Sequence, residues 1–150
     1  MNTLKLEDHH FRAIAEATHD WESLFSPTGE LLWANSAVER LTGFTVEECF
    51  AQGTFPLPIV HTADRPHFER TLNGAVQGTS GNDHEFRIST KAQQIRYVSM
   101  SWQPMRSASG ELRGSRCSIR DITERRAAEE AIRRSEENLR VAIGASRIGI

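Results

Sequence analysis

The stretch Arg120-Asp121-Ile122-Thr123-Glu124-Arg125-Arg126 separates two parts of the chain that differ in character. Before it, short apolar runs alternate with turn residues; after it, the sequence is charged and alanine-rich, with no glycine or proline until Gly144. Asp121 and Glu124 have the spacing of a capping box, in which the first side chain accepts from free N–H groups of a helix and the glutamate reaches back. We therefore expect a last strand to pass directly into a helix, with Asp121, Thr123 and Glu124 relaying changes in the sheet. The alternative is an ordinary capping box that only starts a helix.

Length and composition indicate one ordinary globular domain. The chain has 150 residues, of which 38% are hydrophobic and 25% charged, values typical of a soluble protein. A net charge of −2 gives no reason to expect nucleic acid or an anionic membrane as a partner. Cys49 and Cys117 do not make a disulfide framework and fit a reducing, cytoplasmic compartment. No apolar run approaches the roughly 20 residues of a membrane span, although a longer parent protein could be anchored elsewhere.

Hydrophobic periodicity predicts a mixed α and β chain. Strands are expected at 21–25, 30–34, 84–89, 96–105 and 111–120. Helices are expected at 8–19, after Ser36, after Thr45 and at 62–76, where capping signals or helical spacing occur. The order is two strands, three or four helices including two short ones, three strands and a long terminal helix.

The terminal helix carries a heptad pattern. Small or apolar residues recur at alternating spacings of four and three, flanked by Glu and Arg, at Ala128, Ile132, Ser135, Leu139, Ala142 and Ser146. Such a seam favours a weak coiled coil, and therefore a homodimer formed through the terminal helices. The alternative is a surface helix that folds back on its own domain.

Residues 11–18 resemble residues 139–146, an offset of 139 − 11 = 128 at every position. An internal repeat of this kind predicts a second copy of the same domain. Its first strand is expected from Ile148 onward.

Six short pieces, in this order and at these spacings, carry a family resemblance. They are Ser26-Pro27-Thr28-Gly29-Glu30 with Asn35, 41–48, 60–65, Glu85-Phe86-Arg87, Arg96-Tyr97-Val98 and 121–125. Over about residues 10–126 the chain resembles a PAS domain with its C-terminal PAC segment. The resemblance implies an α+β fold with a five-stranded antiparallel sheet in the order 2-1-5-4-3, helices on one face and a C-terminal exit helix. It also implies a sensor of a bacterial signalling protein, such as a histidine kinase of a two-component system or a diguanylate cyclase.

These patterns together divide the chain. We expect an N-terminal amphipathic helix at 1–19, the PAS/PAC sensor domain at 20–121, a signalling helix at 122–146 and the start of a second PAS domain at 147–150.

The apolar face of the helix at 62–76 and the alternating face of the strand at 96–105 predict a shared interior. In the family this interior holds ligands, haem or flavin, so we expect a small-molecule pocket there. Its expected residues are Trp33, Phe55, Phe68, Leu72, Val98, Met100, Trp102 and Cys117. The alternative is that these side chains, including the two tryptophans, only fill the core.

Two histidines are candidate functional groups. His84-Glu85-Phe86-Arg87 resembles the phosphoacceptor box of histidine kinases, but the sequence around it has a strand pattern, so we expect a partly exposed strand histidine. His67 lies where haem-binding PAS sensors place their ligand, yet one histidine on a helix is not a haem site, and we expect it on the helix surface.

Catalysis has little support in the sequence. Cys49 lacks the Asn-Cys-Arg context of light-driven cysteinyl adducts, and we find no phosphate loop, clustered metal ligands or nucleophile triad. We expect a non-catalytic module, with no bound cofactor. A flavin- or haem-bearing redox or gas sensor and a ligand-free spacer in a tandem array are the alternatives.

Overall fold

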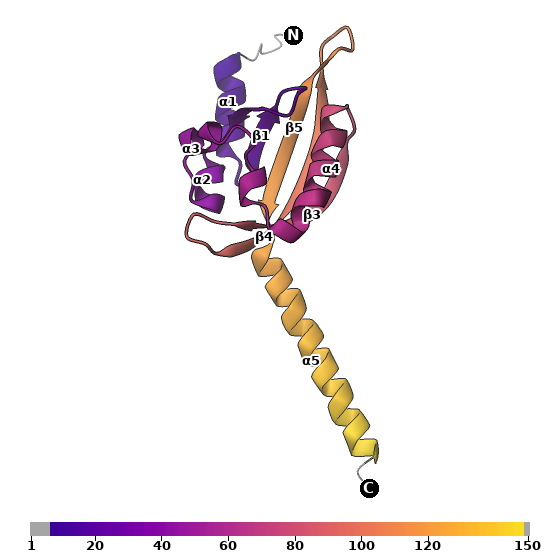
Figure 1. Ribbon diagram of the computed structural model, residues 1–150. Helices are drawn as coiled ribbons and strands as arrows, with labels where there is room; N and C mark the ends of the chain where they lie inside the picture. Colours follow the sequence, from indigo (N-terminus) through magenta and orange to yellow (C-terminus); the bar gives the residue numbers. More distant parts are fainter. Residues whose placement is uncertain (1–6, 149–150) are drawn as a thin grey trace, which may run out of the picture.

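The computed structural model describes residues 7–148. Its five strands form one antiparallel sheet in the order β2-β1-β5-β4-β3, with neighbouring segments pairing as the resemblance implies. The helices that connect β2 to β3 pack against the core face of this sheet (Figure 1). The strands are β1 (Trp21–Phe25), β2 (Leu31–Ala34), β3 (Gly81–Ser89), β4 (Ile95–Arg106) and β5 (Leu112–Asp121). The predicted fold class is therefore confirmed.

Helices fill the connections and the two ends of the chain. The structure has α1 (Asp8–Ala17), α2 (Ala37–Thr42), α3 (Val46–Ala51), α4 (Arg65–Val76) and α5 (Thr123–Ile148), with 3-10 turns at Leu57–Ile59 and Thr62–Asp64. The helix predicted from residue 62 thus opens with a 3-10 turn and becomes α-helical at Arg65. Proline is tolerated there because the first-turn N–H groups of a helix have no intrahelical partner.

The capping signals of the two short helices had different outcomes. The box at Thr45 and Glu48 is present, with Glu48 N donating to Thr45 Oγ1 at 3.1 Å and Thr45 N to Glu48 Oε1 at 3.4 Å. The box expected at Ser36 was wrong, because the Ser36 hydroxyl instead donates to Glu16 Oε2 at 2.7 Å. Gly43 ends α2 in the left-handed region with φ +80°, the conformation that glycine commonly adopts just past a helix.

The register of β1 with β2 places Trp33 outside the core. Trp33 pairs with Leu24, and the pairing shifts between Leu24 and Phe25, which explains why the apolar residues of this hairpin do not alternate cleanly. Trp21 and Phe25 are buried in the main core, whereas Trp33 and Leu24 line a cavity of about 750 Å³ that also contacts α1. The prediction of Trp33 in the shared interior was therefore wrong.

Strand β3 starts three residues earlier than the expected 84–89. It begins at Gly81, which pairs with Trp102, and the register shifts between Gly81 and His84. A side chain at Gly81 would overlap the indole ring of Trp102. Gly81 therefore lets the Trp102 ring approach the backbone of β3 closely, which a residue with a side chain would prevent.

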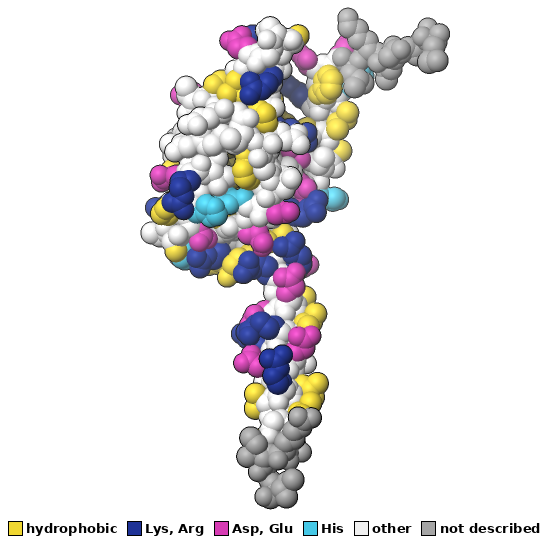
Figure 2. Space-filling view, turned by 90° about the vertical axis from the view of Figure 1, so that its right-hand side faces the viewer, with side chains coloured by type: hydrophobic (Ala, Val, Ile, Leu, Met, Phe, Trp, Pro, Cys, Tyr) yellow, Lys and Arg dark blue, Asp and Glu magenta, His cyan; other side chains and the backbone are white. Residues whose placement is uncertain are grey.

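Helix α5 leaves the domain at the end opposite to α1 and stands clear of the sheet (Figures 1 and 2). Ile132 and Leu139 of the heptad seam are 60% and 63% exposed, so the alternative of a helix folded back on its own domain was wrong. The helix includes Ile148; Gly149 and Ile150, where the expected strand of a second copy continues, lie outside the described residues.

Candidate functional site

The joint between β5 and α5 is built around the carboxylate of Asp121. One oxygen, Oδ1, accepts from Thr123 N at 2.9 Å and from Thr123 Oγ1 at 2.6 Å. The other, Oδ2, accepts from Arg96 Nη1 of β4 at 2.8 Å. Burial alone would raise the pKa of Asp121, but the bonds from Thr123 and Arg96 hold it below its ordinary value of 3.8. Asp121 is therefore a charged bridge between two strands and the start of the helix.

The predicted capping box is present in part. Asp121 bonds to the Thr123 N–H, as expected, but it is the last residue of β5, and α5 begins at Thr123. The exposed Glu124 side chain makes no hydrogen bond to Asp121 among the described residues. The partner of Asp121 that comes from outside this stretch is Arg96, which the local spacing could not reveal.

Tyr97 of β4 fixes the first turn of α5 through its backbone. Its N–H donates to Thr123 Oγ1 at 3.0 Å, and its carbonyl accepts from Ile122 N at 2.8 Å. The aromatic ring also packs against the guanidinium of Arg126, 4.4 Å from the ring centroid, a cation–π geometry. The helix is therefore attached to the strand beside its own.

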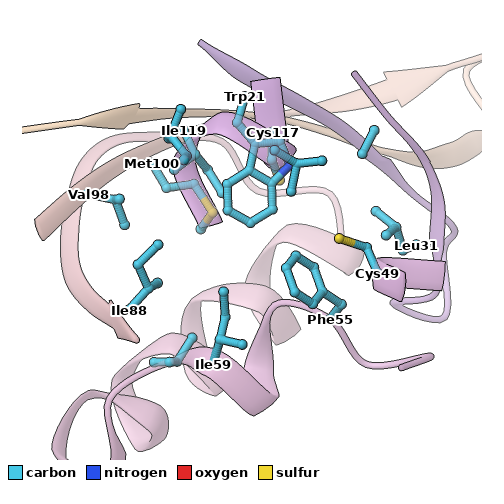
Figure 3. Close-up of a cluster of buried hydrophobic side chains, with 14 of the residues drawn as sticks. Trp21, Leu31, Cys49, Phe55, Ile59, Ile88, Val98, Met100, Cys117 and Ile119 are labelled. Carbon is cyan, nitrogen blue, oxygen red and sulfur yellow. The ribbon is translucent and has the colours of Figure 1, made fainter. Parts of the chain in front are cut away.

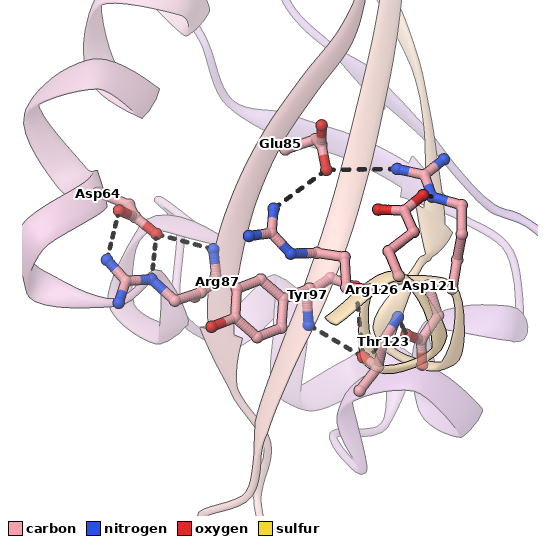
Figure 4. A network of polar contacts seen from close by, with 9 residues as sticks. Asp64, Glu85, Arg87, Tyr97, Asp121, Thr123 and Arg126 are labelled. Atoms are coloured by element: carbon pink, nitrogen blue, oxygen red, sulfur yellow. Dashed lines mark hydrogen bonds and ion pairs between the residues drawn. The ribbon is translucent and has the colours of Figure 1, made fainter. Parts of the chain in front are cut away.

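A third strand reaches the same turn through Glu85 of β3. Glu85 Oε1 lies 3.3 Å from both Arg125 Nη2 and Arg126 Nη1. Figure 4 shows Glu85, Tyr97, Arg126, Thr123 and Asp121 around the start of the helix. Strands β3, β4 and β5 thus all contact residues 122–126.

A second ion pair connects the helical layer to this sheet. Asp64, which immediately precedes α4, accepts from Arg87 of β3 through Nη2 at 2.8 Å, Nε at 2.9 Å and the backbone N at 2.9 Å. Hydrogen bonds from Arg87 lower the pKa of Asp64 to about 2. The pair fixes the start of α4 on the strand that also carries Glu85.

Most of the expected pocket residues meet in the interior. Phe55, Phe68, Val98, Met100 and Cys117 are buried together, with Leu72 and Trp102 packed against them. Figure 3 shows Phe55, Val98, Met100 and Cys117 within this cluster. Aromatic side chains fill part of the space, since the rings of Trp21 and Phe55 lie 5.6 Å apart and those of Phe68 and Phe86 5.0 Å.

Two polar side-chain groups of β1 lack a hydrogen-bond partner in this interior. Trp21 Nε1 and Ser23 Oγ are buried and make no hydrogen bond among the described residues. Both belong to β1, two residues apart, and therefore point to the same face of the sheet. Burying an unpaired polar group is unfavourable, so such groups suit a polar guest.

The candidate histidines lie on β3 and α4, and the two cysteines lie on α3 and β5. His84 lies on β3, as its strand pattern predicted, but it is buried rather than partly exposed. His67 lies on the exposed face of α4, as predicted. Burial raises the pKa of the Cys49 and Cys117 thiols to about 12, which keeps them protonated and unreactive. Within residues 7–148 no three His, Cys, Asp or Glu side chains are arranged to hold a metal ion.

Comparison with known proteins identifies the family. The profile of the PAS fold family matches residues 31–117. No curated protein matches the chain. The helices of the described part are all too short or too polar to cross a membrane.

Solved structures with this fold include several sensors. A sensory box histidine kinase/response regulator from Burkholderia thailandensis is 20% identical, with a TM-score of 0.64 over 87% of this chain and 97% of that one. The N-terminal domain of a diguanylate cyclase with PAS/PAC sensor from Marinobacter aquaeolei is 12% identical, with a TM-score of 0.59 over 71% and 98%. An RNA-binding light-oxygen-voltage receptor is 17% identical, with a TM-score of 0.72 over 91% of this chain and 41% of that one.

PAS domains are generally non-catalytic sensor modules. The family match, the sheet order and the helical layer agree with one another. The chain belongs to the PAS fold family.

Proposed function

We propose that this PAS domain relays the state of its interior to an effector, such as a histidine kinase or diguanylate cyclase, through the joint at residues 121–126. The observation that carries the proposal is the attachment of one helical turn to β3, β4 and β5 by Glu85, Tyr97 and Asp121. Strand shifts would then move or loosen α5 as a unit, because a helix transmits displacement along its axis.

The proposal is tested by removing one attachment in the full-length protein. Glu85→Gln weakens the contact with Arg125 and Arg126 while preserving side-chain size. Its control is Glu30→Gln, which changes an exposed glutamate far from the joint. We expect Glu85→Gln to change effector output at least several-fold with little change in melting temperature, and the control to leave both unchanged. Equal output from the two folded variants would contradict the proposal.

A small polar ligand in the interior is the second part of the proposed function. It is supported by the unpartnered Trp21 Nε1 and Ser23 Oγ, which a ligand with a donor and an acceptor would satisfy. Mass spectrometry of the purified protein under native conditions should detect a bound small molecule, and Ser23→Ala should reduce its occupancy. A flavin or haem would appear in the visible absorption spectrum of the same sample. Protein that carries no ligand and gains none from a metabolite library would contradict this part.

The third part is a homodimer formed through the terminal helices. It is supported by the exposed apolar residues of both helices, Phe11 and Ile14 in α1 at 56% and 59%, and Ile132 and Leu139 in α5. Figure 2 shows hydrophobic side chains along α5 between charged ones, as in a coiled-coil seam. Leu139→Asp should weaken association measured by sedimentation equilibrium, whereas Arg140→Asp, outside the seam, should weaken it less. A monomer at all concentrations would contradict the dimer.

A further inference from the structure

Two histidines from different layers lie against each other at the contact between α4 and β3. The ring centroids of His67 and His84 are 4.4 Å apart and the rings are nearly perpendicular, at 88°. His84 is 8% exposed, and its Nε2 is buried without a hydrogen-bond partner among the described residues. His67 is exposed. The surroundings of the buried His84 imidazole therefore favour its neutral form, whereas the neighbouring His67 ring is accessible to water.

The remaining surroundings of His84 are aromatic or apolar. Its ring lies 5.4 Å from Phe86, 6.3 Å from Trp102 and 6.5 Å from Phe68, between centroids. Across the strands it pairs with Met100. None of these side chains can accept a hydrogen bond from a protonated imidazole with the strength of a carboxylate, so a charge on His84 would be poorly solvated.

The ionisable groups that face His84 do not compensate for this. His67 on α4 carries a like charge when it is protonated, which opposes a second positive charge on His84. Asp64, before α4, attracts that charge, but its carboxylate is already occupied by Arg87, at 2.8 and 2.9 Å. Burial first, and then His67, place the pKa of His84 below its ordinary value of 6.5.

We propose that His84 is a proton-sensing site, at which protonation in mild acid separates α4 from β3 and loosens the first turn of α5. The separated state hydrates the imidazolium, and it is favoured because the packed state leaves Nε2 buried without a hydrogen-bond partner. The stabilisation of the packed state is complete above pH 6.5, the ordinary value. It is lost progressively as the pH falls from there toward the lowered pKa of the packed state, because the separated state binds a proton that the packed state does not.

The connection to α5 runs through the next residue of β3. His84 and Glu85 are neighbours on one strand, so their side chains point to opposite faces. His84 packs against α4, and Glu85 contacts Arg125 and Arg126 of α5. A shift of β3 away from α4 therefore displaces the Glu85 carboxylate from both arginines. This last step rests on the proposed relay through α5, whereas the titration and separation at His84 do not.

The test is an NMR titration of the whole chain from pH 7.5 to about 5, with histidine ring and backbone amide signals followed together. We expect the His84 ring to titrate with a midpoint below 6.5, and the amides of α4, β3, Arg125 and Arg126 to move with the same midpoint. An imidazole with a midpoint at or above 6.5 overturns the proposal. Movement of the α4 and β3 amides while Arg125 and Arg126 stay still overturns the link to α5; the effect of Glu85→Gln on output then tells whether the relay itself also fails.

Three variants separate this site from other titrating groups. His84→Gln should remove the shared transition, and His19→Gln, which changes an exposed histidine, should retain it. His67→Gln keeps the buried imidazole and removes the neighbouring charge, so the His84 midpoint should move to higher pH. Should His84→Gln fail to fold, His67→Gln decides alone: an unchanged His84 midpoint, or amide transitions that no longer coincide with it, overturns the proposal.

Discussion

Removal of the Asp121 carboxylate should loosen α5 while leaving the domain folded. Asp121→Ala deletes three hydrogen bonds, from Thr123 N, Thr123 Oγ1 and Arg96 Nη1, at 2.9, 2.6 and 2.8 Å. Loss of a side-chain cap costs about 0.5–2 kcal/mol, and a partly exposed ion pair adds about 0–1 kcal/mol. We therefore expect about 0.5–3 kcal/mol of local destabilisation. The domain should stay folded, because the core between the helices and the sheet is untouched.

The assay is amide hydrogen exchange of residues 123–126, with thermal melting measured in parallel. A local loss of about 0.5–3 kcal/mol should speed exchange about 2- to 160-fold if these amides exchange by local opening. Asp121→Asn keeps an oxygen that accepts from Thr123 but removes the charge facing Arg96, so it should have a smaller effect. Glu129→Ala is the matched control, since it removes only an exposed pair with Arg125 within the helix.

Signalling in the full-length protein completes this test. Asp121→Ala should reduce signal-dependent effector output far more than it reduces melting temperature, whereas Glu129→Ala should change neither greatly. Equal exchange and equal output in the two folded variants would mean that Asp121 is only a helix cap, and the relay through it would be refuted.

Three further changes probe the remaining contacts. Asp64→Asn should lower the free energy of unfolding at pH 7 by about 1–3 kcal/mol. This difference should vanish as the pH falls from 3.8 toward the lowered pKa of about 2, because the native carboxylate is then protonated. A difference in urea midpoints that persists at pH 2 would contradict this. Gly81→Ala should cost about 1–3 kcal/mol, since its Cβ would overlap Trp102, and tryptophan fluorescence should report the displaced ring; an unchanged melting temperature and spectrum would contradict it. Cys49 and Cys117 should react with a thiol reagent at pH 8 only when the protein unfolds, because burial raises the pKa of both thiols to about 12; rapid labelling of native protein would show that the core opens.

Local sequence signals predicted helix starts and ends well where these depend on hydrogen bonds and backbone conformation within a few residues. The box at Thr45 and Glu48 and the left-handed Gly43 each depend on residues close in the chain. Gly81 fell outside the strand expected at 84–89 because the segment before His84 is rich in Gly, Ser and Asn, whereas the space that Gly81 leaves is used by Trp102, 21 residues later (102 − 81). The sheet order came from the family resemblance, since pairing between distant strands leaves no local pattern.

The candidate site was predicted only in part, because some of its contacts join residues that are far apart in the chain. Asp121 was identified from its capping-box spacing with Glu124, but Arg96 and Tyr97 act from a neighbouring strand. Arg96-Tyr97-Val98 stood among the family-like pieces, which was the available signal for these partners. Trp33 was misplaced because a register shift in the β1–β2 hairpin decides its face, and hydrophobicity alone does not determine register.

The pairing of His67 with His84 had no sequence signal. The two residues are 17 positions apart (84 − 67) and belong to a helix and a strand whose contact is set by the tertiary fold. Sequence motifs concern each histidine alone, as a haem ligand or a phosphoacceptor. The contact between the two rings exists only in the folded structure.

The central claim, that the interior of the domain is coupled to α5, is tested most directly by hydrogen exchange in a variant with a small internal defect. Ile88→Val removes one methylene from a fully buried residue of β3, at a cost of about 0.5–1.5 kcal/mol. Its control, Ile14→Val, makes the same change on the exposed surface of α1. We predict faster exchange of the Arg125 and Arg126 amides in Ile88→Val alone, and loss of this difference when Asp121→Ala is added to both. Equal exchange at Arg125 and Arg126 in Ile88→Val and Ile14→Val, with both proteins folded, would contradict the coupling.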